Sequence, residues 1–293
     1  MLDSGRAGKF KRKNGGYDEG YTNGGNMAWE EIEKAGIRAY YKDDAVFIIN
    51  ADCREVLPEL PDIIQTVFID PPFNVGKKYG SNGDNRKDYY EWCEAWLTLC
   101  FDRLVDTGTL YLMTIPRHLE RLYPMLGSRG VFINEIHWRN VSASHSKRGF
   151  WNSYQPILFY GKGQDYYFNT YAQTREQMNR WTEWFTGAKG QMLDYWDDIP
   201  FIYAGSIRHK EAVMKPLTNE KAHPCQMPKE LAARAIMFSS KEYEVILDPF
   251  LGSGTTAVKA KELGRHCIGI EIEEKYCEIA AKRCSQSVME LEI

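Results

Sequence analysis

Seven short apolar runs, separated by stretches with helical spacing, limit the possible folds of this chain more than any other feature. The runs lie at residues 45–50, 66–70, 109–114, 131–138, 156–161, 245–250 and 266–272. Short apolar runs that alternate with helices are typical of βαβ units and a largely parallel sheet. At 293 residues the chain is long enough for one large α/β domain with a smaller insertion. We therefore expect a Rossmann-like, mostly parallel, seven-stranded sheet flanked by helices.

Residues 88–105 show the helical pattern between two of these runs. Trp92, Trp96 and Leu99 recur at the 3.6-residue period and predict an apolar stripe that packs on the sheet. Gly108 is expected to end this helix.

Two parts of the chain depart from this alternation. Residues 1–26 are rich in Gly, Lys, Arg and Asn and almost free of apolar residues, which predicts a flexible tail. Residues 163–222 are polar and aromatic without a clear period, which predicts an inserted subdomain. The remaining stretches, 37–162 and 223–293, then form two halves of one α/β domain.

The composition excludes several other classes of protein. No run of 18 apolar residues occurs, and the N-terminal residues lack the apolar segment of a secretory signal, so we expect a cytoplasmic protein that has no membrane partner. The seven cysteines form no CxxC pair and their number is odd, which indicates reduced thiols. The spacing of His145, His209 and His223 does not suit a metal, and no metal is expected. The formal charge of −3 does not by itself indicate a polyanion partner.

A glycine-rich turn follows the apolar run at 245–250. In "ILDPFLGSGTTAVKA" the expected strand ends at Asp248 and a helix begins near Thr255. This arrangement brings backbone amides and a helix N-terminus close to a ligand. Gly252 and Gly254 belong to a G-x-G-x-x-A sequence of the kind that binds nucleoside cofactors.

Two acidic residues narrow the choice of cofactor. Glu271 ends the next expected strand, at the spacing where an acidic residue accepts hydrogen bonds from ribose hydroxyls. Asp248 at the mouth of the turn would repel a pyrophosphate and favour a cationic ligand. S-adenosyl-L-methionine carries an ammonium and a sulfonium and fits this turn, whereas NAD remains an alternative because the glycine pattern alone is weak.

A second motif, "VFIDPPFNVG" at 67–76, ends another apolar run with a stiff corner. Pro71 and Pro72 have no amide hydrogens and a fixed φ, so Pro71 offers only its carbonyl. That carbonyl and the Asp70 carboxylate form two neighbouring acceptors that suit an NH₂ group. Phe73 adds a flat face on which a base can stack.

The motifs together resemble a known family. "DPPF" at 70–73, "HPCQMP" at 223–228 and "LDPFLGSGTT" at 247–256, in this order, are similar to the β-class of S-adenosylmethionine-dependent amino methyltransferases of DNA. The resemblance covers about residues 44–284 and implies a class I methyltransferase fold in which the catalytic half, 37–162, precedes the cofactor half, 223–293.

The resemblance implies a role for each matching residue. Asp70 and the Pro71 carbonyl, in the corner completed by Pro72, hold the exocyclic amine of a flipped base, and Phe73 stacks on that base. The cofactor-binding residues it implies, with Glu271 at the ribose and Asp52 near the adenine, are Asp52, Asp248, Pro249, Phe250, Gly252, Gly254, Thr255 and Glu271. Many members have Tyr at the position of Phe73 and Lys at that of Met227.

Residues 138–163 resemble the loop and strand that line the target-base pocket of the family. Phe150 and Tyr154 are candidates to surround the base together with Trp138. The residues expected to contact the substrate or the DNA are Trp138, Arg139, Lys147 and Arg148. The insertion at 163–222 is then a target-recognition region.

The resemblance implies methyl transfer to the N6 amine of adenine in double-stranded DNA, with the base flipped out. Aspartate before the prolines favours adenine, because cytosine-N4 relatives often have serine there. Cytosine N4 and an adenine of RNA remain alternatives. An NAD-dependent oxidoreductase and a non-catalytic DNA-binding module are hypotheses of different classes. A homodimer and a companion restriction endonuclease are possible partners.

Overall fold

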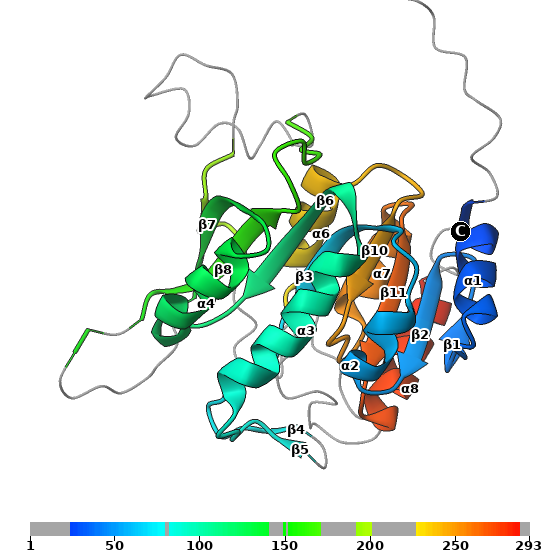
Figure 1. Cartoon of the computed structure of the whole chain (residues 1–293), viewed down its shortest axis with the longest axis horizontal. Coiled ribbons are helices and arrows are strands. Elements are labelled where there is room, and N and C mark those ends of the chain that lie inside the picture. The colour runs from blue at the N-terminus through cyan, green and yellow to red at the C-terminus, as the bar shows by residue number, and fades with distance from the viewer. Residues whose placement is uncertain are drawn as a thin grey trace, which may run out of the picture.

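A nine-stranded mixed sheet runs through the centre of the computed structural model (Figure 1). The structure describes residues 24–79, 82–140, 149–150, 152–170, 192–200 and 227–287. The order across the sheet is β1-β2-β11-β10-β3-β6-β8-β7-β9. Its strands are β1 (Tyr41–Lys42), β2 (Val46–Asn50), β3 (Ile64–Ile69), β6 (Leu104–Met113), β7 (Val131–Arg139), β8 (Tyr154–Gly161), β9 (Tyr195–Trp196), β10 (Val245–Asp248) and β11 (His266–Glu271). A separate antiparallel pair is formed by β4 (Lys78–Tyr79) and β5 (Asn82–Gly83).

The expected α/β fold class is confirmed, but the expected count of seven strands is wrong. Each of the seven apolar runs overlaps one strand of the large sheet. The two additional strands, β1 and β9, have two residues each and lie at the two edges. Two residues are too few to show the alternation that identifies a strand in a sequence, so hydrophobic pattern does not reveal them.

Five neighbouring strands at the centre of the sheet are parallel. They are β2, β11, β10, β3 and β6, and beyond them β8 is antiparallel to both β6 and β7. All six residues of β3 and all four of β10 are buried. Parallel strands covered on both faces are apolar along their whole length, which is why these runs show no alternation.

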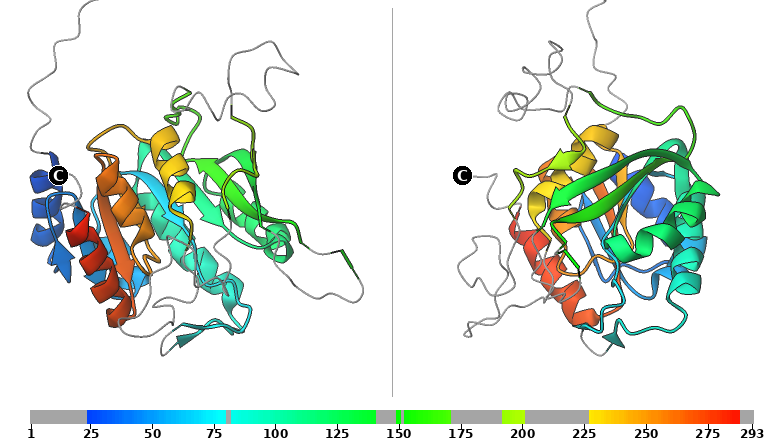
Figure 2. Two further views of the ribbon diagram at one scale, coloured as in Figure 1. Left: turned by 180° about the vertical axis from the view of Figure 1, so that it is seen from behind. Right: turned by 90° about the vertical axis from the view of Figure 1, so that its left-hand side faces the viewer.

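Helices cover both faces of the sheet (Figure 2). One apolar layer contains buried residues of α1, α2, α3 and α4, and the other contains buried residues of α6, α7 and α8. The helices are α1 (Gly24–Lys34), α2 (Cys53–Val56), α3 (Tyr89–Arg103), α4 (Leu119–Gly127), α6 (Lys229–Ser239), α7 (Thr255–Glu262) and α8 (Glu274–Gln286), with single 3₁₀ turns η1 (Leu57–Glu59) and η2 (Pro116–His118). Among the helices that the structure describes, none has the length and apolar character needed to cross a membrane.

The predicted helix at 88–105 is present as α3, but it ends earlier than expected. It stops at Arg103, and β6 begins at once with Leu104. Gly108 lies inside β6, where a Cβ would come within 2.8 Å of the Val105 carbonyl oxygen. The glycine therefore permits a close backbone approach within the strand instead of ending the helix.

The chain reverses direction across the sheet between β3 and β10. From β3 it continues to β6 and the β7–β8 hairpin on one side, whereas from β10 it continues to β11 on the other side. The two strands are parallel neighbours, with Leu247 paired to Val67. Such a switch point opens a crevice at the carboxyl ends of the strands, where ligands of α/β proteins bind. Asp70 and Asp248 lie at this position.

The expected insertion and tail lie partly outside the described residues. Residues 171–191 and 201–222 of the insertion, 223–226 of the cofactor half and 1–23 of the tail are outside them, and the tail's last three residues begin α1. Within the insertion, the Tyr167 and Asn169 amides donate to backbone carbonyls at Thr107 and Phe238. Residues 195 and 196 form β9 beside β7.

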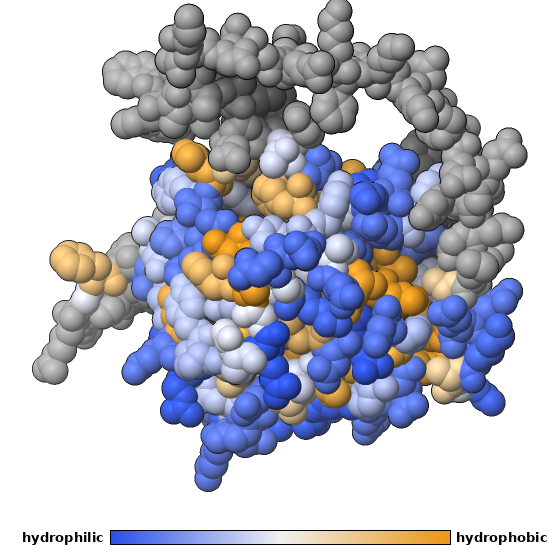
Figure 3. Space-filling model, turned by 45° about the horizontal axis from the view of Figure 1, so that its top comes forward, coloured by the Kyte–Doolittle hydropathy of each residue, from blue (hydrophilic) through white to orange (hydrophobic). Residues whose placement is uncertain are grey.

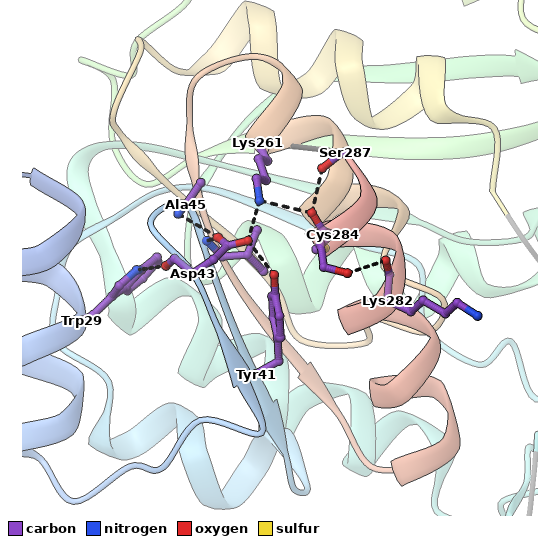
Figure 4. Close-up of polar contacts among 10 residues, drawn as sticks. Trp29, Tyr41, Asp43, Ala45, Lys261, Lys282, Cys284 and Ser287 are labelled. Carbon is purple, nitrogen blue, oxygen red and sulfur yellow. Dashed lines mark hydrogen bonds and ion pairs between the residues drawn. The ribbon is translucent and has the colours of Figure 1, made fainter. Parts of the chain in front are cut away.

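A polar cluster joins the β1 edge of the sheet to the helices beside it (Figure 4). The Asp43 carboxylate accepts hydrogen bonds from the Ala45 amide at 2.9 Å and the Tyr41 hydroxyl at 2.7 Å. It also pairs with Lys261 of α7 at 2.5 Å, and the Asp43 carbonyl accepts from the Trp29 indole of α1. These contacts hold the pKa of Asp43 below its ordinary value, although burial opposes them.

Candidate active site

The corner after β3 contains the predicted catalytic residues. Asp70 follows the strand directly, and Pro71 and Pro72 continue the chain outside the sheet. Because neither proline has an amide hydrogen, these positions donate no ladder hydrogen bonds. Phe73 is partly buried and packs against the apolar layer on the α6, α7 and α8 side. All four predicted residues therefore meet at the carboxyl end of β3.

The glycine-rich turn lies beside this corner, after β10. The Phe250 amide donates to the Asp248 carboxylate at 3.0 Å, and the Leu251 amide donates to the Ile270 carbonyl at 2.9 Å. Gly252 has a φ of 54°, in the left-handed region that favours glycine. The turn thus runs from β10 across to β11, and α7 begins at Thr255 as expected.

Gly254 cannot be replaced without moving another helix. Its φ is 82°, and a Cβ there would come within 2.7 Å of the Ala280 Cβ of α8. From the same helix, Arg283 donates to the Ser253 carbonyl and hydroxyl and, at 3.3 Å, to the Thr255 hydroxyl. The turn is therefore held tightly against α8 and is a fixed part of the site.

Glu271 links β11 to the glycine-rich turn. Its Oε2 accepts from the Gly252 amide at 2.8 Å, and its Oε1 accepts from the Glu273 amide at 2.9 Å. The side chain is buried, and burial raises its pKa. Each carboxylate oxygen can accept further hydrogen bonds, so Glu271 is able to receive two hydroxyl groups in the crevice.

The other two predicted cofactor residues in this region already have protein partners. Asp52 follows β2 and caps α2, accepting from the Arg54 amide at 2.9 Å and pairing with its guanidinium at 2.6 Å. The Arg54 contacts hold the pKa of Asp52 below its ordinary value. Phe250 packs edge-on against the rings of Trp92 and Trp96 of α3, at centroid distances of 5.5 and 5.0 Å.

The two aspartates of the crevice have unusually high pKa values. Burial raises the pKa of Asp70 to about 7, the charge of Asp248 adds to this effect, and Lys77 opposes it. Burial likewise raises the pKa of Asp248 to about 7, with Glu271 adding to the effect and the Thr256 hydroxyl opposing it. Perturbed carboxyls at a switch-point crevice are typical of functional sites.

These residues fit S-adenosyl-L-methionine. Among the described residues, Asp248 forms no ion pair, although its side chain is only 4% exposed. A cationic ligand in the crevice would supply the missing positive charge, and the Glu271 carboxylate beside it suits ribose hydroxyls. In the described part of the chain, no cluster of side chains is suited to hold a metal.

The residues expected to contact DNA have different surroundings. Trp138 is in the core, where its indole donates to the Ile199 carbonyl at 3.0 Å, while Arg139 at the end of β7 is exposed. Phe150 is fully exposed. Lys147 and Arg148 lie outside the described residues, as do the three histidines considered above as metal ligands. On the face shown in Figure 3, hydrophilic residues predominate and apolar residues appear as patches between them.

Two residues that belong to none of the sequence motifs also contact the corner. His118 Nε2 lies 2.9 Å from the Phe73 carbonyl oxygen, and Arg117 donates to that oxygen at 3.3 Å. Both belong to η2, which follows β6. The sequence signal for both residues is that they follow β6, a parallel neighbour of β3. The carboxyl ends of parallel neighbouring strands lie at the same edge of the sheet.

Comparison with known proteins shows the family to which the chain belongs. A family model for N6 and N4 methyltransferases, described as DNA methylase, matches residues 64–282. The chain is 30% identical over 230 residues to the type II methyltransferase M1.MboII of Moraxella bovis, covering 73% of this chain and 86% of that protein. It is 30% identical over 256 residues to M.HinfI of Haemophilus influenzae, covering 80% and 67%.

Solved structures show the same fold. PvuII DNA methyltransferase, described as cytosine-N4-specific, matches with a TM-score of 0.62 at 18% identity and covers 85% of this chain and 89% of that one. TTHA0409 of Thermus thermophilus, solved with S-adenosyl-L-methionine, matches with a TM-score of 0.57 at 24% identity, covering 82% and 93%.

The parallel sheet, the glycine-rich turn and the acidic residue at the end of β11 together define a class I methyltransferase. The family match then makes the assignment particular. The chain belongs to the DNA methylase family of N6 and N4 amino methyltransferases, enzymes that use S-adenosyl-L-methionine.

Proposed function

We propose that the protein methylates the N6 amine of adenine at specific sites in double-stranded DNA. The observation that carries this proposal is the pair of acceptors after β3, the half-buried Asp70 carboxyl and the Pro71 carbonyl, directly beside the crevice formed with β10. An amino group with two hydrogens matches two acceptors. The choice of adenine rests on the aspartate at position 70, where the cytosine-N4 relatives of the family often have serine.

The two acceptors would activate a weak nucleophile. The lone pair of an exocyclic amine is delocalised into the ring of the base, so hydrogen bonds to its hydrogens favour the pyramidal geometry in which that pair points toward the methyl group. The acceptors also stabilise the positive charge that develops on nitrogen. The cofactor supplies an electrophilic methyl group on its sulfonium. With a pKa raised to about 7, Asp70 is suited to take the proton that the nitrogen then releases.

Phe73 would hold the flipped base. Removing a base from the duplex costs a few kcal/mol of stacking and pairing. Stacking on an aromatic ring contributes roughly 1–3 kcal/mol and offsets part of this cost. We also assign the cofactor residues to separate parts of the ligand: the turn from Asp248 to Thr255 to the methionine part, Glu271 to the ribose and Asp52 to the adenine side.

Contacts with DNA would come from the edge of the sheet beyond β6. The exposed Arg139 lies at the end of β7, and residues 141–148, which include Lys147 and Arg148, follow it in the chain. We propose that these residues contact phosphates and that the insertion, 163–222, reads the sequence. Trp138 would support the base pocket from the core. A companion restriction endonuclease is proposed from the type II names of the relatives.

One experiment tests the proposal directly. The protein is incubated with cofactor labelled on its methyl group and unmethylated genomic DNA, and the DNA is then digested to nucleosides. Labelled N6-methyl-2′-deoxyadenosine from the DNA supports the proposal, and labelled N4-methyl-2′-deoxycytidine would assign the activity to cytosine instead. The same assay on RNA tests the remaining alternative. Transfer to RNA with none to DNA would contradict the proposal.

A further inference from the structure

The catalytic corner is held in place from outside the sheet. Asp70 is the last residue before two prolines without amide hydrogens, so the chain leaves the ladder of β3 at this point. The carbonyl of Phe73 instead accepts hydrogen bonds from η2, at 2.9 Å from His118 Nε2 and at 3.3 Å from Arg117 Nη2. Arg117 also donates to the Asn74 carbonyl.

The Phe73 carbonyl and the Tyr90 hydroxyl favour one tautomer of His118, although Arg117 Nε also lies 3.4 Å from the Nε2 atom. A carbonyl oxygen only accepts, so His118 Nε2 carries the hydrogen that points to Phe73. The opposite ring nitrogen, Nδ1, lies 2.9 Å from the hydroxyl of Tyr90 in α3, and in the neutral ring it accepts from that hydroxyl. Burial and the charge of Arg117 lower the pKa of His118, which favours the neutral ring.

The histidine itself has little freedom to move. It is 3% exposed, and its ring lies 4.8 Å from the ring of Tyr89. The guanidinium of Arg121, on α4, lies 4.9 Å from the centre of the Tyr90 ring. A chain of contacts thus runs from two helices through Tyr90 and His118 to the Phe73 carbonyl.

The residue after the corner is fixed as well. Asn74 has a φ of 54°, and its side chain exchanges two hydrogen bonds with the Arg86 backbone, at 3.0 and 2.6 Å. The Val75 amide donates to the Asp84 carboxylate at 3.1 Å. Both sides of the Phe73 peptide are therefore anchored, and His118 is the anchor on the side nearer β6.

We propose that His118, oriented by Tyr90, is a positioning residue that holds the Phe73 peptide and thereby the acceptors of the catalytic corner in the geometry for methyl transfer. This inference rests on the proposed function for its catalytic part. Reactions of bound groups depend strongly on alignment, and a displacement of about 1 Å can lower a rate about 100-fold. A looser corner would slow transfer without weakening the cofactor site on the other side of the crevice.

The test compares four variants. His118→Leu removes the donor, and His118→Gln keeps an amide donor at a similar reach. Tyr90→Phe removes only the hydroxyl that orients the ring. His266→Leu is the matched control, because His266 is also buried and contacts a backbone carbonyl, that of Tyr243 at 2.8 Å, but lies at the start of β11, away from the corner.

We expect His118→Leu to lower kcat about 100-fold, with the KM for the cofactor and its equilibrium Kd unchanged. His118→Gln should recover most of this loss, and Tyr90→Phe should lower kcat about tenfold or less. His266→Leu should leave kcat unchanged at temperatures below its melting point. A kcat of His118→Leu within a factor of about two of wild type, or an equal loss in His266→Leu, would overturn the inference.

Hydrogen exchange separates a failure of this inference from a failure of the proposed function. In the protein with bound cofactor, the backbone amides of residues 73–75 should exchange about fivefold faster or more in His118→Leu than in wild type or His266→Leu. Unchanged exchange there overturns the positioning role whatever the activity. Absence of methyl transfer by the wild-type protein, with faster exchange in the variant, refutes the proposed function and the catalytic part of the inference, while the anchoring contact stands.

Discussion

Two carboxylate environments within the same sheet differ in how fully the charge is satisfied. Asp43, at the β1 edge, accepts from two backbone amides and a tyrosine hydroxyl and pairs with Lys261, and its pKa is lowered. At the switch point Asp70 is half-buried and Asp248 is buried, and the pKa of each is raised to about 7. The first environment stabilises the fold, whereas the second leaves charge to be satisfied by a ligand.

The number of partners distinguishes a carboxylate of a ligand site from a carboxylate of the structural polar network. A carboxylate with a full set of partners gains nothing from a ligand, so Asp43 has no chemistry to offer. A buried carboxylate with few partners lowers the stability of the unliganded protein, but a cationic ligand or an amine can then complete its surroundings. Substitutions that remove one carboxylate at a time should separate the two roles.

The largest effect is expected for Asp70→Asn. The amide would place a donor where the proposed reaction needs an acceptor for the amine hydrogens and the released proton. Loss of one such preorganised group costs about 10²–10³ in kcat, so we expect transfer from labelled cofactor to fall about 1,000-fold. Calorimetry should show cofactor binding close to that of wild type. Transfer within tenfold of the wild-type rate would contradict the catalytic role of Asp70.

The next effect is expected for Asp248→Asn, on the other strand of the crevice. Its carboxylate has no ion-pair partner among the described residues, so the substitution removes the charge available to a cationic ligand. A charge-assisted contact contributes about 1.5–3 kcal/mol, which predicts an increase of about 10–100-fold in the Kd for S-adenosyl-L-methionine. S-adenosylhomocysteine, which lacks the sulfonium charge, should lose less affinity. Equal losses for both would point to an effect on the turn alone.

Asp43→Asn tests the structural carboxylate at the β1 edge of the sheet. Lys261 would lose its ion pair with Asp43 in a position where it is only 12% exposed, and would keep its hydrogen bond to the Cys284 carbonyl. Removal of a hydrogen-bonded partner costs about 1–3 kcal/mol. We expect the free energy of unfolding, from urea titration, to fall by about 2 kcal/mol while the cofactor Kd stays unchanged. A weaker cofactor affinity with unchanged stability would show that the two regions are not separate.

The smallest effect is expected in the pH dependence of stability. At Asp70 and Asp248 the folded-state pKa, about 7, lies above the ordinary value of 3.8. The folded protein therefore binds protons there that the unfolded chain does not, and these carboxyls favour the folded state more as the pH falls from 8 to 6. Asp43 has a lowered pKa, so its contribution to stability is present at any pH above the ordinary pKa of an aspartate. That contribution is lost only when the pH falls to acid values.

Urea titrations at pH 6 and pH 8, without cofactor, measure this contribution. The stability difference between the two pH values should favour pH 6 in wild type, relative to the Asp70→Asn, Asp248→Asn double variant, by about 1 kcal/mol for each of the two carboxyls removed. The double variant removes both carboxyls and keeps the other titrating groups, including His118. The same pH dependence in both proteins would show that the crevice carboxyls do not carry it.

The sequence predicted the elements that bury long apolar runs. Each apolar run became a strand, and Asp70, Asp248 and Glu271 were expected at strand ends and lie there. The predicted end of α3 at Gly108 is wrong, because β6 begins as soon as Leu104 can enter the sheet. Local composition describes a helix end poorly when the next strand competes for the same residues.

The contacts around the corner could not be predicted, because they join segments without a shared motif. Tyr90, His118 and Phe73 come from three elements, and only the order of strands across the sheet brings them together. Trp138 lies in a segment that does resemble a motif, but its role could not be predicted either. An aromatic residue in a segment that resembles a base pocket is equally suited to the core, where its side chain lies.

The place of β10 in the sheet also governs how the protein is made. This strand pairs with β3 on one side and β11 on the other, yet it follows β3 by about 175 positions in the chain. At about 5–20 residues per second, a ribosome needs on the order of 10–35 s to add that length. During this interval β3, the strand that leads to Asp70, has an unpaired edge, the kind of edge that invites association with other chains. The half of the crevice that contains Asp70 is therefore synthesised early and completed late.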